Sequence, residues 1–419
     1  MEPPLQHIRL SNRRPRRSSR PRRVAIFTGA YNHVVDGISL TLNRLVGHLE
    51  SQGFEVLVFA PGDGEPAMEH EGTLVEVPSF PIPFRKDYFV SKGLIGDARK
   101  RLDAFEPDLI HIATPDYLGL TALLYALKRD IPIVASYHTH FISYLKYYHL
   151  ELFTPLIWRY LRWSYGKGRH LYVPTESMAD VLRSHGLADN MRLWPRGIET
   201  RRFTPENRSL AWRRNLGIDD DEVVVLFVSR LVWEKCLDVL SGTLHQLRDR
   251  GVRHRAIVIG SGPAREELQA MAPPDVIFMG HMEGDDLTTA YASSDVFLFP
   301  SATETFGNVT LEAMASGLPV VGADAPGTAS LVLDQSTGYL CPPADEHAFS
   351  VALEKLVVDE RLRGGMSQAA IEEAQRYDWD RVLATMVTYY DEVLGTRAPS
   401  KSAPFVRPQA IRQRPMVTG

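Results

Sequence analysis

The chain has 419 residues and a formal net charge of −4, with 44% hydrophobic and 23% charged residues, which is the composition of a soluble globular protein. This length predicts two or three domains rather than a single hydrophobic core. No apolar run reaches the roughly 18 residues of a transmembrane helix, the basic N-terminus lacks the apolar stretch of a secretory signal, and two cysteines are too few for a disulfide framework.

Both ends of the chain are basic. Residues 1–23 carry a charge of +7 and residues 396–419 a charge of +5, so a total of −4 leaves −16 for the residues between them. We predict that residues 1–22 and 396–419 are disordered arms. Their cations either stay solvated or touch an anionic membrane surface, where each contributes about 1 kcal/mol. No pattern typical of a nucleic-acid module occurs, so we expect no nucleic-acid partner.

Residues 23–197 are predicted to form the first domain. Ser39 is placed to cap a helix that ends near Gly53. Short apolar runs alternate with helical patterns, which predicts a parallel sheet covered by helices. The predicted strands are residues 24–28, 54–60, 109–112, 133–136 and 171–173.

Residues 194–205 interrupt this alternation and are interpreted as a linker. The alternation then restarts, and residues 198–375 are predicted to form a second domain. A helix within residues 376–395 is expected to cross back to the first domain. The predicted fold is therefore α/β, with two Rossmann-like, doubly wound domains that face a cleft. The strands predicted for the second domain are residues 223–228, 255–259, 276–279, 296–299 and 319–321.

Residues 301–321 are the most informative segment. A polar loop runs to Gly307, a helical pattern begins after it, and the helix stops near Gly317. Free amides at the start of a helix favour an anion such as a diphosphate. Glu304 precedes this helix and Glu312 lies about one turn inside it. Since carboxylates repel phosphate, we expect these two acids to bind the hydroxyls of a sugar and a ribose.

This segment resembles the donor motif of glycosyltransferase family 4, whose members are retaining enzymes of the GT-B fold, and the resemblance covers nearly all of residues 23–395. It implies that Glu304 contacts sugar hydroxyls and that Glu312 binds the ribose diol of a nucleotide-sugar donor. It also implies that the departing diphosphate takes the proton of the acceptor. No Asp-x-Asp motif lies in a suitable loop, so we expect no cofactor and no obligatory metal. The loop amides that would hold phosphate or sugar are those of Phe306, Gly307, Asn308 and Val309.

Two further loops of the second domain match the family. Residues 229–235 are similar to its phosphate-binding loop, which implies that Arg230 and Lys235 hold the diphosphate. Ser229 and Cys236 stand where that loop usually has glycine. Gly262 and Met282 match the positions that line the nucleotide pocket.

In the first domain, Gly37 resembles the loop glycine that lets the backbone approach the donor. His138 is the best match for a family histidine near the donor sugar, and His140 is the runner-up. Tyr137 is expected on the acceptor side. Thr175 either orients the leaving phosphate or the acceptor, or only caps a helix.

The acceptor is expected to be a lipid. Residues 141–165 are dense in aromatic and basic side chains, which favours a membrane interface, with ordinary helix packing as the alternative. Residues 80–86 form a second apolar and basic segment, interpreted as a loop. Within family 4 the chain resembles sulfoquinovosyl-diacylglycerol synthases and the mannosyl- and glucuronosyl-lipid enzymes.

We therefore expect a peripheral cytoplasmic enzyme on the inner face of the plasma membrane. It would move a hexosyl or uronosyl group from a UDP- or GDP-sugar to a diacylglycerol- or ceramide-type lipid. Transfer to a soluble or polyprenyl-linked saccharide is the alternative. A non-catalytic sugar-nucleotide-binding membrane adaptor and a GT-B epimerase are more distant alternatives.

Overall fold

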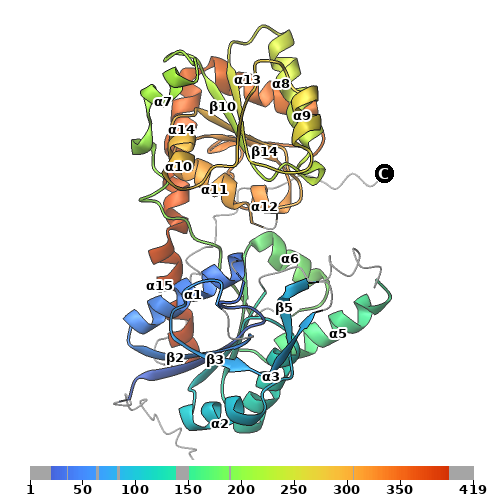
Figure 1. Ribbon diagram of the computed structural model, residues 1–419, viewed down its shortest axis with the longest axis vertical. Helices are drawn as coiled ribbons and strands as arrows, with labels where there is room; N and C mark the ends of the chain where they lie inside the picture. Colours follow the sequence, from blue (N-terminus) through green and yellow to red (C-terminus); the bar gives the residue numbers. More distant parts are fainter. Residues whose placement is uncertain are drawn as a thin grey trace, which may run out of the picture. The chain divides into compact units, whose positions relative to one another are not determined.

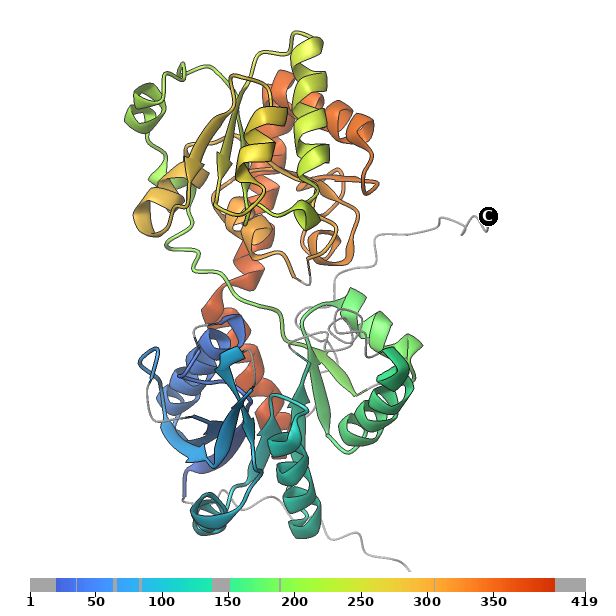
Figure 2. The same ribbon diagram turned by 45° about the vertical axis from the view of Figure 1, so that its right-hand side comes forward.

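The computed structural model describes residues 20–34, 36–62, 66–82, 85–137, 151–187, 190–304 and 306–395. These residues form two sheets of parallel strands, and helices cover both faces of each sheet, as Figure 1 and Figure 2 show. This architecture confirms the predicted α/β fold with two Rossmann-like sheets. Within the described residues, no helix is long and apolar enough to cross a membrane.

The first sheet has the strand order β3-β2-β1-β6-β7-β8-β9. All residues of β6, β7 and β8 are buried, because helices cover both faces of the sheet. The mostly apolar sequences of these strands suit this position. The strands are β1 (Arg22–Phe27), β2 (Phe54–Pro61), β3 (Thr73–Val77), β6 (Leu109–Ile112), β7 (Ile133–Ser136), β8 (His170–Val173) and β9 (Met191–Leu193). The helices are α1 (Gly37–Ser51), α2 (Gly96–Phe105), α3 (Tyr117–Arg129), α5 (Thr154–Tyr165) and α6 (Glu176–Ser184).

The loop predicted for residues 80–86 is wrong. β4 (Ser79–Ile82) and β5 (Arg85–Ser91) pair there as an antiparallel hairpin. Pro81 lies within β4, opposite Phe89. A two-stranded hairpin leaves each strand one unpaired edge, where a proline without an N–H is tolerated, so the prolines of this segment do not prevent pairing.

The cap predicted for α1 is also wrong. The Asp36 carboxylate, not Ser39, accepts from the backbone N–H groups of Ile38 and Ser39, at 2.9 and 2.8 Å. Asp36 has an extended backbone, as an N-cap requires, whereas Ser39 is buried inside the first turn.

The second sheet has the strand order β12-β11-β10-β13-β14-β15, and all of its pairings are parallel. The strands are β10 (Val224–Val228), β11 (Arg255–Ile259), β12 (Ile277–Gly280), β13 (Val296–Phe299), β14 (Val320–Ala323) and β15 (Gly338–Cys341). The helices are α7 (Leu210–Asn215), α8 (Leu237–Asp249), α9 (Arg265–Met271), α10 (Gly284–Ala292), α11 (Asn308–Ala315), α12 (Pro326–Ala329), α13 (Glu346–Val358) and α14 (Glu360–Ala374). The chain winds outward from β10 in one direction and then from β13 in the other, so the strand order reverses between these two strands.

The last helix, α15 (Trp379–Val393), packs its C-terminal half against the first sheet. The Tyr390 hydroxyl lies 2.6 Å from Nδ1 of His111 on β6, and Nε2 of His111 lies 2.5 Å from the Ser136 hydroxyl at the end of β7. His111 is fully buried, and burial lowers its pKa to about 3, so the ring is neutral at physiological pH. This hydrogen-bonded chain fastens α15 to two strands.

Candidate active site at the carboxyl edge of the second sheet

The loops that follow β10 and β13 meet at the point where the strand order reverses. Lys235 lies in the short helical turn after β10 (Trp233–Lys235), and Glu304 lies in the loop after β13. Although 69 residues separate them, Lys235 Nζ lies 2.5 Å from Glu304 Oε1. Ligands of doubly wound sheets bind at this position, so the structure brings two predicted catalytic residues together where a donor is expected.

The Glu304 carboxylate has a second partner in its own loop. The fully buried Ser301 hydroxyl donates to Glu304 Oε1 at 3.1 Å. The Thr303 hydroxyl donates to the backbone carbonyl of Glu234 at 3.3 Å, which ties the loop after β13 to the loop after β10. Both loops are therefore held in place by contacts that cross from one to the other.

The start of α11 has the geometry of an anion site. Gly307 precedes the helix with φ 92°, a left-handed conformation that glycine adopts without penalty. This backbone conformation explains why the motif has glycine at this position. Asn308 is exposed and Val309 is half-buried, whereas Phe306 is buried against the ring of Tyr377. The first two N–H groups of α11, those of Asn308 and Val309, have no partner within the helix and are available to an anion, whereas the Thr310 N–H donates to the Gly307 carbonyl at 3.0 Å.

Glu312 lies in the second turn of α11. Tyr291 on α10 is fully buried, and its hydroxyl donates to Glu312 Oε2 at 3.0 Å. Burial raises the pKa of the Glu312 carboxyl, while this hydrogen bond and the nearby Arg202 act against that rise. Sequence reasoning missed Tyr291, because it has the appearance of an ordinary core residue on an amphipathic helix.

The glycine turn after β11 packs directly on the loop after β10. A Cβ at Gly260 would lie 1.8 Å from the carbonyl oxygen of Ser229, and one at Gly262 would lie 2.2 Å from that of Leu231. The Leu231 N–H donates to the Ser261 carbonyl at 2.9 Å. These close approaches require glycine and place Gly262 beside the segment that carries Arg230.

Arg230 is exposed, and among the described residues its guanidinium makes no ion pair or side-chain hydrogen bond. Met282 follows β12 and is half-buried. A cation without a carboxylate partner is free to neutralise a diphosphate.

Cys236 has a backbone conformation that glycine adopts most readily. Its φ of 55° and ψ of 51° lie in the left-handed region, where a residue with a Cβ is strained by about 1 kcal/mol. The loop that carries Lys235 therefore follows the path that a glycine would allow, at some cost in stability.

Gly327 is a further residue that the sequence reasoning missed. It lies in α12, and a Cβ there would be 2.4 Å from both the Cβ and the carbonyl oxygen of Glu304. The signal was present as the dipeptide Pro326-Gly327 after β14, but its meaning depends on which loop packs against it. Glycine at this position lets the Glu304 loop lie directly on α12.

The residues predicted for the first sheet each follow one of its strands. Gly37 begins α1 after β1, and Tyr137 is buried immediately after β7, where burial raises the pKa of its hydroxyl. The Thr175 hydroxyl accepts from the Met178 N–H at 3.1 Å and so caps α6. His138 and His140 lie outside the described residues.

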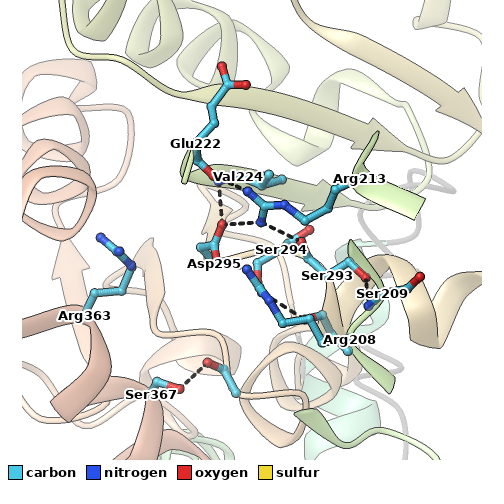
Figure 3. Close-up of polar contacts among 12 residues, drawn as sticks. Arg208, Ser209, Arg213, Glu222, Val224, Ser293, Ser294, Asp295, Arg363 and Ser367 are labelled. Atoms are coloured by element: carbon cyan, nitrogen blue, oxygen red, sulfur yellow. Dashed lines mark hydrogen bonds and ion pairs between the residues drawn. The ribbon is translucent and has the colours of Figure 1, made fainter. Parts of the chain in front are cut away.

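At the amino edge of the second sheet, polar side chains bind one another and the backbone (Figure 3). The fully buried Arg213 donates to the Ser293 carbonyl at 3.1 Å and to Asp295 at 2.9 Å, which fastens α7 to the start of β13. A hollow of about 310 Å³ lies at this edge, lined in part by Arg208 and Arg363. Arg208 is bound to Asp295 and Arg363 donates to two helix carbonyls, so these groups serve the packing of the edge.

Comparisons of the sequence with known families agree with this geometry. Residues 35–202 match Glycosyltransferase Family 4, and residues 209–373 match Glycosyl transferases group 1. The chain is 33% identical over 376 residues to sulfoquinovosyl transferase SQD2 of Arabidopsis thaliana, covering 87% of this chain and 72% of that protein. It is 31% identical to a GDP-mannose-dependent alpha-mannosyltransferase of Corynebacterium glutamicum, covering 90% of each. It is 28% identical to alpha-monoglucosyldiacylglycerol synthase of Streptococcus pneumoniae, covering 76% of this chain and 75% of that one.

Solved structures show the same fold. Sucrose-phosphate synthase of Thermosynechococcus elongatus superposes with a TM-score of 0.69 at 20% identity, covering 90% of this chain and all of that one. HepE of Anabaena, solved in complex with UDP, superposes with a TM-score of 0.68 at 18% identity, covering 88% of this chain and all of that one.

Proposed function

This chain belongs to glycosyltransferase family 4 and has the GT-B fold, and we propose that it transfers a hexosyl or uronosyl group from a UDP- or GDP-sugar to a membrane lipid. It is a glycosyltransferase, and retention of the anomeric configuration accords with its family. The proposed acceptor is a diacylglycerol- or ceramide-type lipid, and the proposed place of work is the inner face of the plasma membrane.

The observation that carries the donor half of the proposal is the meeting of Lys235 and Glu304 at the reversal of the strand order, beside the free amides of α11. The α11 amides and the cations Arg230 and Lys235 would hold the diphosphate. Glu304 would accept hydrogen bonds from sugar hydroxyls. Its carboxylate lies beside Lys235 and would not contact the phosphate.

The chemistry proposed for these groups is charge stabilisation and positioning. As the bond between the sugar and the diphosphate breaks, negative charge grows on the leaving oxygen, and preorganised donors stabilise that charge. Lys235 and the amides of α11 are such donors, because their positions are fixed by the loops and the helix that carry them. The acceptor would attack the face from which the diphosphate leaves, and no metal is required by this scheme.

The acceptor half is supported by the name of one relative and by the outer face of α5. Alpha-monoglucosyldiacylglycerol synthase is named for a glycosylated diacylglycerol. Along and just before α5, the side chains of Leu152, Phe153 and Leu156 are exposed by 89, 51 and 51%. Trp158 and Leu161 pack inward, so inward packing accounts for one face of this helix and leaves a second apolar face uncovered.

This second face also carries charge of the sign that anionic lipids attract. Arg159 is exposed on the same side of the helix as Leu156 and Trp163, and the ring of Trp163 is 41% exposed. Apolar and aromatic side chains beside arginines are typical of a helix that lies in the membrane interface. We therefore propose that α5 contacts the lipid surface that supplies the acceptor.

The alternative is a soluble acceptor. The chain is 34% identical to a D-inositol 3-phosphate glycosyltransferase of Saccharomonospora viridis, although this match covers 54% of the chain. The same donor site would serve both reactions, and a transfer assay with both kinds of acceptor distinguishes them.

A donor and acceptor screen tests the proposal. Purified protein is incubated with UDP- and GDP-sugars and with a membrane lipid extract, while release of nucleoside diphosphate and new glycolipid are measured. Release with one donor together with a new glycolipid supports the proposal. Transfer to a soluble sugar, with lipids ignored, refutes the lipid acceptor and leaves the donor site intact.

Vesicle binding tests the role of α5 separately. Leu156→Ser should weaken binding to anionic phospholipid vesicles several-fold, because an apolar side chain no longer enters the interface. Leu124→Ser on α3 is the matched control, since Leu124 is also 51% exposed. Equal binding of both variants would exclude the α5 face, and a chain that lacks residues 1–22 would then show whether the basic arm binds.

A further inference from the structure

The hydroxyl of Tyr291, on α10, contacts the carboxylate of Glu312, on the neighbouring helix α11. The side chain is fully buried, and its oxygen lies 3.0 Å from Glu312 Oε2 and 3.4 Å from the Val309 carbonyl. A phenol has one proton to donate, and the carboxylate is both the nearer and the stronger acceptor. The hydrogen bond to Glu312 is therefore the main one.

The ring of Tyr291 is held rigidly. The edge of Phe203 contacts it with centroids 5.7 Å apart at 75°, and Phe297 of β13 lies 6.0 Å away. A buried aromatic ring between two others has little rotamer freedom, so the position of its hydroxyl is fixed by the core. The fixed Tyr291 hydroxyl thereby holds one carboxylate oxygen of Glu312, whose side chain would otherwise sample several rotamers.

The second oxygen of Glu312 is left available. Among the described residues, Glu312 Oε1 has no hydrogen-bond partner, and Glu312 is only partly enclosed by the protein. A carboxylate accepts hydrogen bonds at both oxygens, so one oxygen bound from the protein side still leaves sites for two neighbouring hydroxyls. This is the acceptor geometry that a vicinal diol requires.

We propose that Tyr291 is a positioning residue that orients Glu312 toward the ribose diol and so makes the site discriminate ribonucleotides from deoxyribonucleotides. The inference rests on the proposed donor site, in which Glu312 binds the ribose. Tyr291 does not touch the donor and acts through the carboxylate.

The charge state of Glu312 is consistent with this role. Burial raises the pKa of this carboxyl, which works against the ionised form that accepts from two hydroxyls. The hydrogen bond from Tyr291 and the charge of Arg202 both favour the ionised form. Removing the hydroxyl should therefore weaken the ribose contact both by freeing the side chain and by favouring its protonation.

The test compares affinities for UDP and GDP with those for their 2′-deoxy counterparts by titration calorimetry, using whichever base binds. Glu312→Ala should bring the ratio of ribo to deoxyribo affinity close to one. Tyr291→Phe should weaken binding of the ribonucleotide about tenfold, with little change for the deoxyribonucleotide. Tyr390→Phe is the matched control, because it also removes a fully buried hydroxyl from a side-chain partner, and it should leave the ratio unchanged.

The outcomes separate the two ideas. A wild-type ratio in Glu312→Ala means that Glu312 does not bind the ribose, and the proposed donor role fails. A collapsed ratio in Glu312→Ala with a wild-type ratio in Tyr291→Phe overturns the inference alone, as does an equal loss of affinity for both nucleotides. Should Tyr291→Phe not fold, Phe203→Leu keeps the hydroxyl but loosens the ring, and a ratio between those of the wild type and Glu312→Ala is then required.

Discussion

Replacing Lys235 should separate the stability of the protein from its turnover. Its ion pair with Glu304 measures 2.5 Å, and the two side chains are 17 and 19% exposed. Exposed pairs contribute about 0–1 kcal/mol, whereas breaking a buried pair costs about 3–5 kcal/mol. For this intermediate burial we expect Lys235→Met to lower the free energy of unfolding by about 1–3 kcal/mol, because it leaves the Glu304 carboxylate without its cation.

The double variant Lys235→Met/Glu304→Gln tests the reason for that loss. With both charges removed, the free energy of unfolding should return to within about 1 kcal/mol of the wild type, since no unpaired charge remains. Turnover should stay at least about 100-fold low in the single and the double variant, because both groups are proposed to act on the donor.

Urea unfolding measures the stability of these variants, and nucleoside diphosphate release from the active donor measures turnover. Lys100→Met is the control: the ion pair of Lys100 with Asp97 lies at the surface, with side chains 82 and 88% exposed, so neither quantity should change. Recovery of turnover in the double variant would show that the pair only holds the fold together. Wild-type turnover in Lys235→Met would remove this lysine from the site.

Three other perturbations follow from the geometry. Cys236→Gly should leave the free energy of unfolding equal or raise it by up to about 1 kcal/mol. Cys236→Val should lower it by about 1–2 kcal/mol, because a branched side chain suits φ 55° poorly. A valine variant that is more stable than the wild type in urea unfolding would contradict the proposed backbone strain. Gly327→Ala places a Cβ 2.4 Å from the backbone of Glu304 and should reduce turnover about tenfold or more, whereas Gly364→Ala, in open space on α14, should stabilise the protein by about 0.5–1 kcal/mol at unchanged turnover. Similar effects of the two alanines would refute the role of the close approach. His111, with a pKa of about 3, stays neutral in the folded protein while the unfolded chain takes up a proton below about pH 6.5, so stability should fall between these pH values by up to about 1.4 kcal/mol per unit as the pH decreases. His111→Gln should make this dependence shallower in urea unfolding at pH 4 to 7, and identical slopes would exclude the buried histidine as the cause.

Much of the fold followed from local patterns. The strands predicted at residues 255–259 and 296–299 match β11 and β13 residue for residue, because apolar runs bounded by turn residues suit buried parallel strands. β3, β9 and β15 were not predicted. They contain exposed or half-buried positions that weaken the apolar signal.

Prediction from neighbouring residues fails where two residues suit the same structural role. Asp36 and Ser39 are both good N-caps, and the choice between them depends on where the backbone turns into the helix. At residues 79–91, the prolines favour a loop when the segment is taken alone, yet pairing of β4 with β5 decides otherwise.

The sequence by itself determined the alternation of strands and helices, the glycines of the strand-end loops, and the residue types of the donor motif, because these depend on neighbours along the chain. It could not determine that Lys235 meets Glu304, since that contact depends on β10 lying beside β13. Nor could it single out Tyr291 among buried tyrosines or Gly327 among turn glycines. Their roles arise from partners brought near by packing and by hydrogen bonds between distant strands, and such partners leave no periodic trace in the sequence.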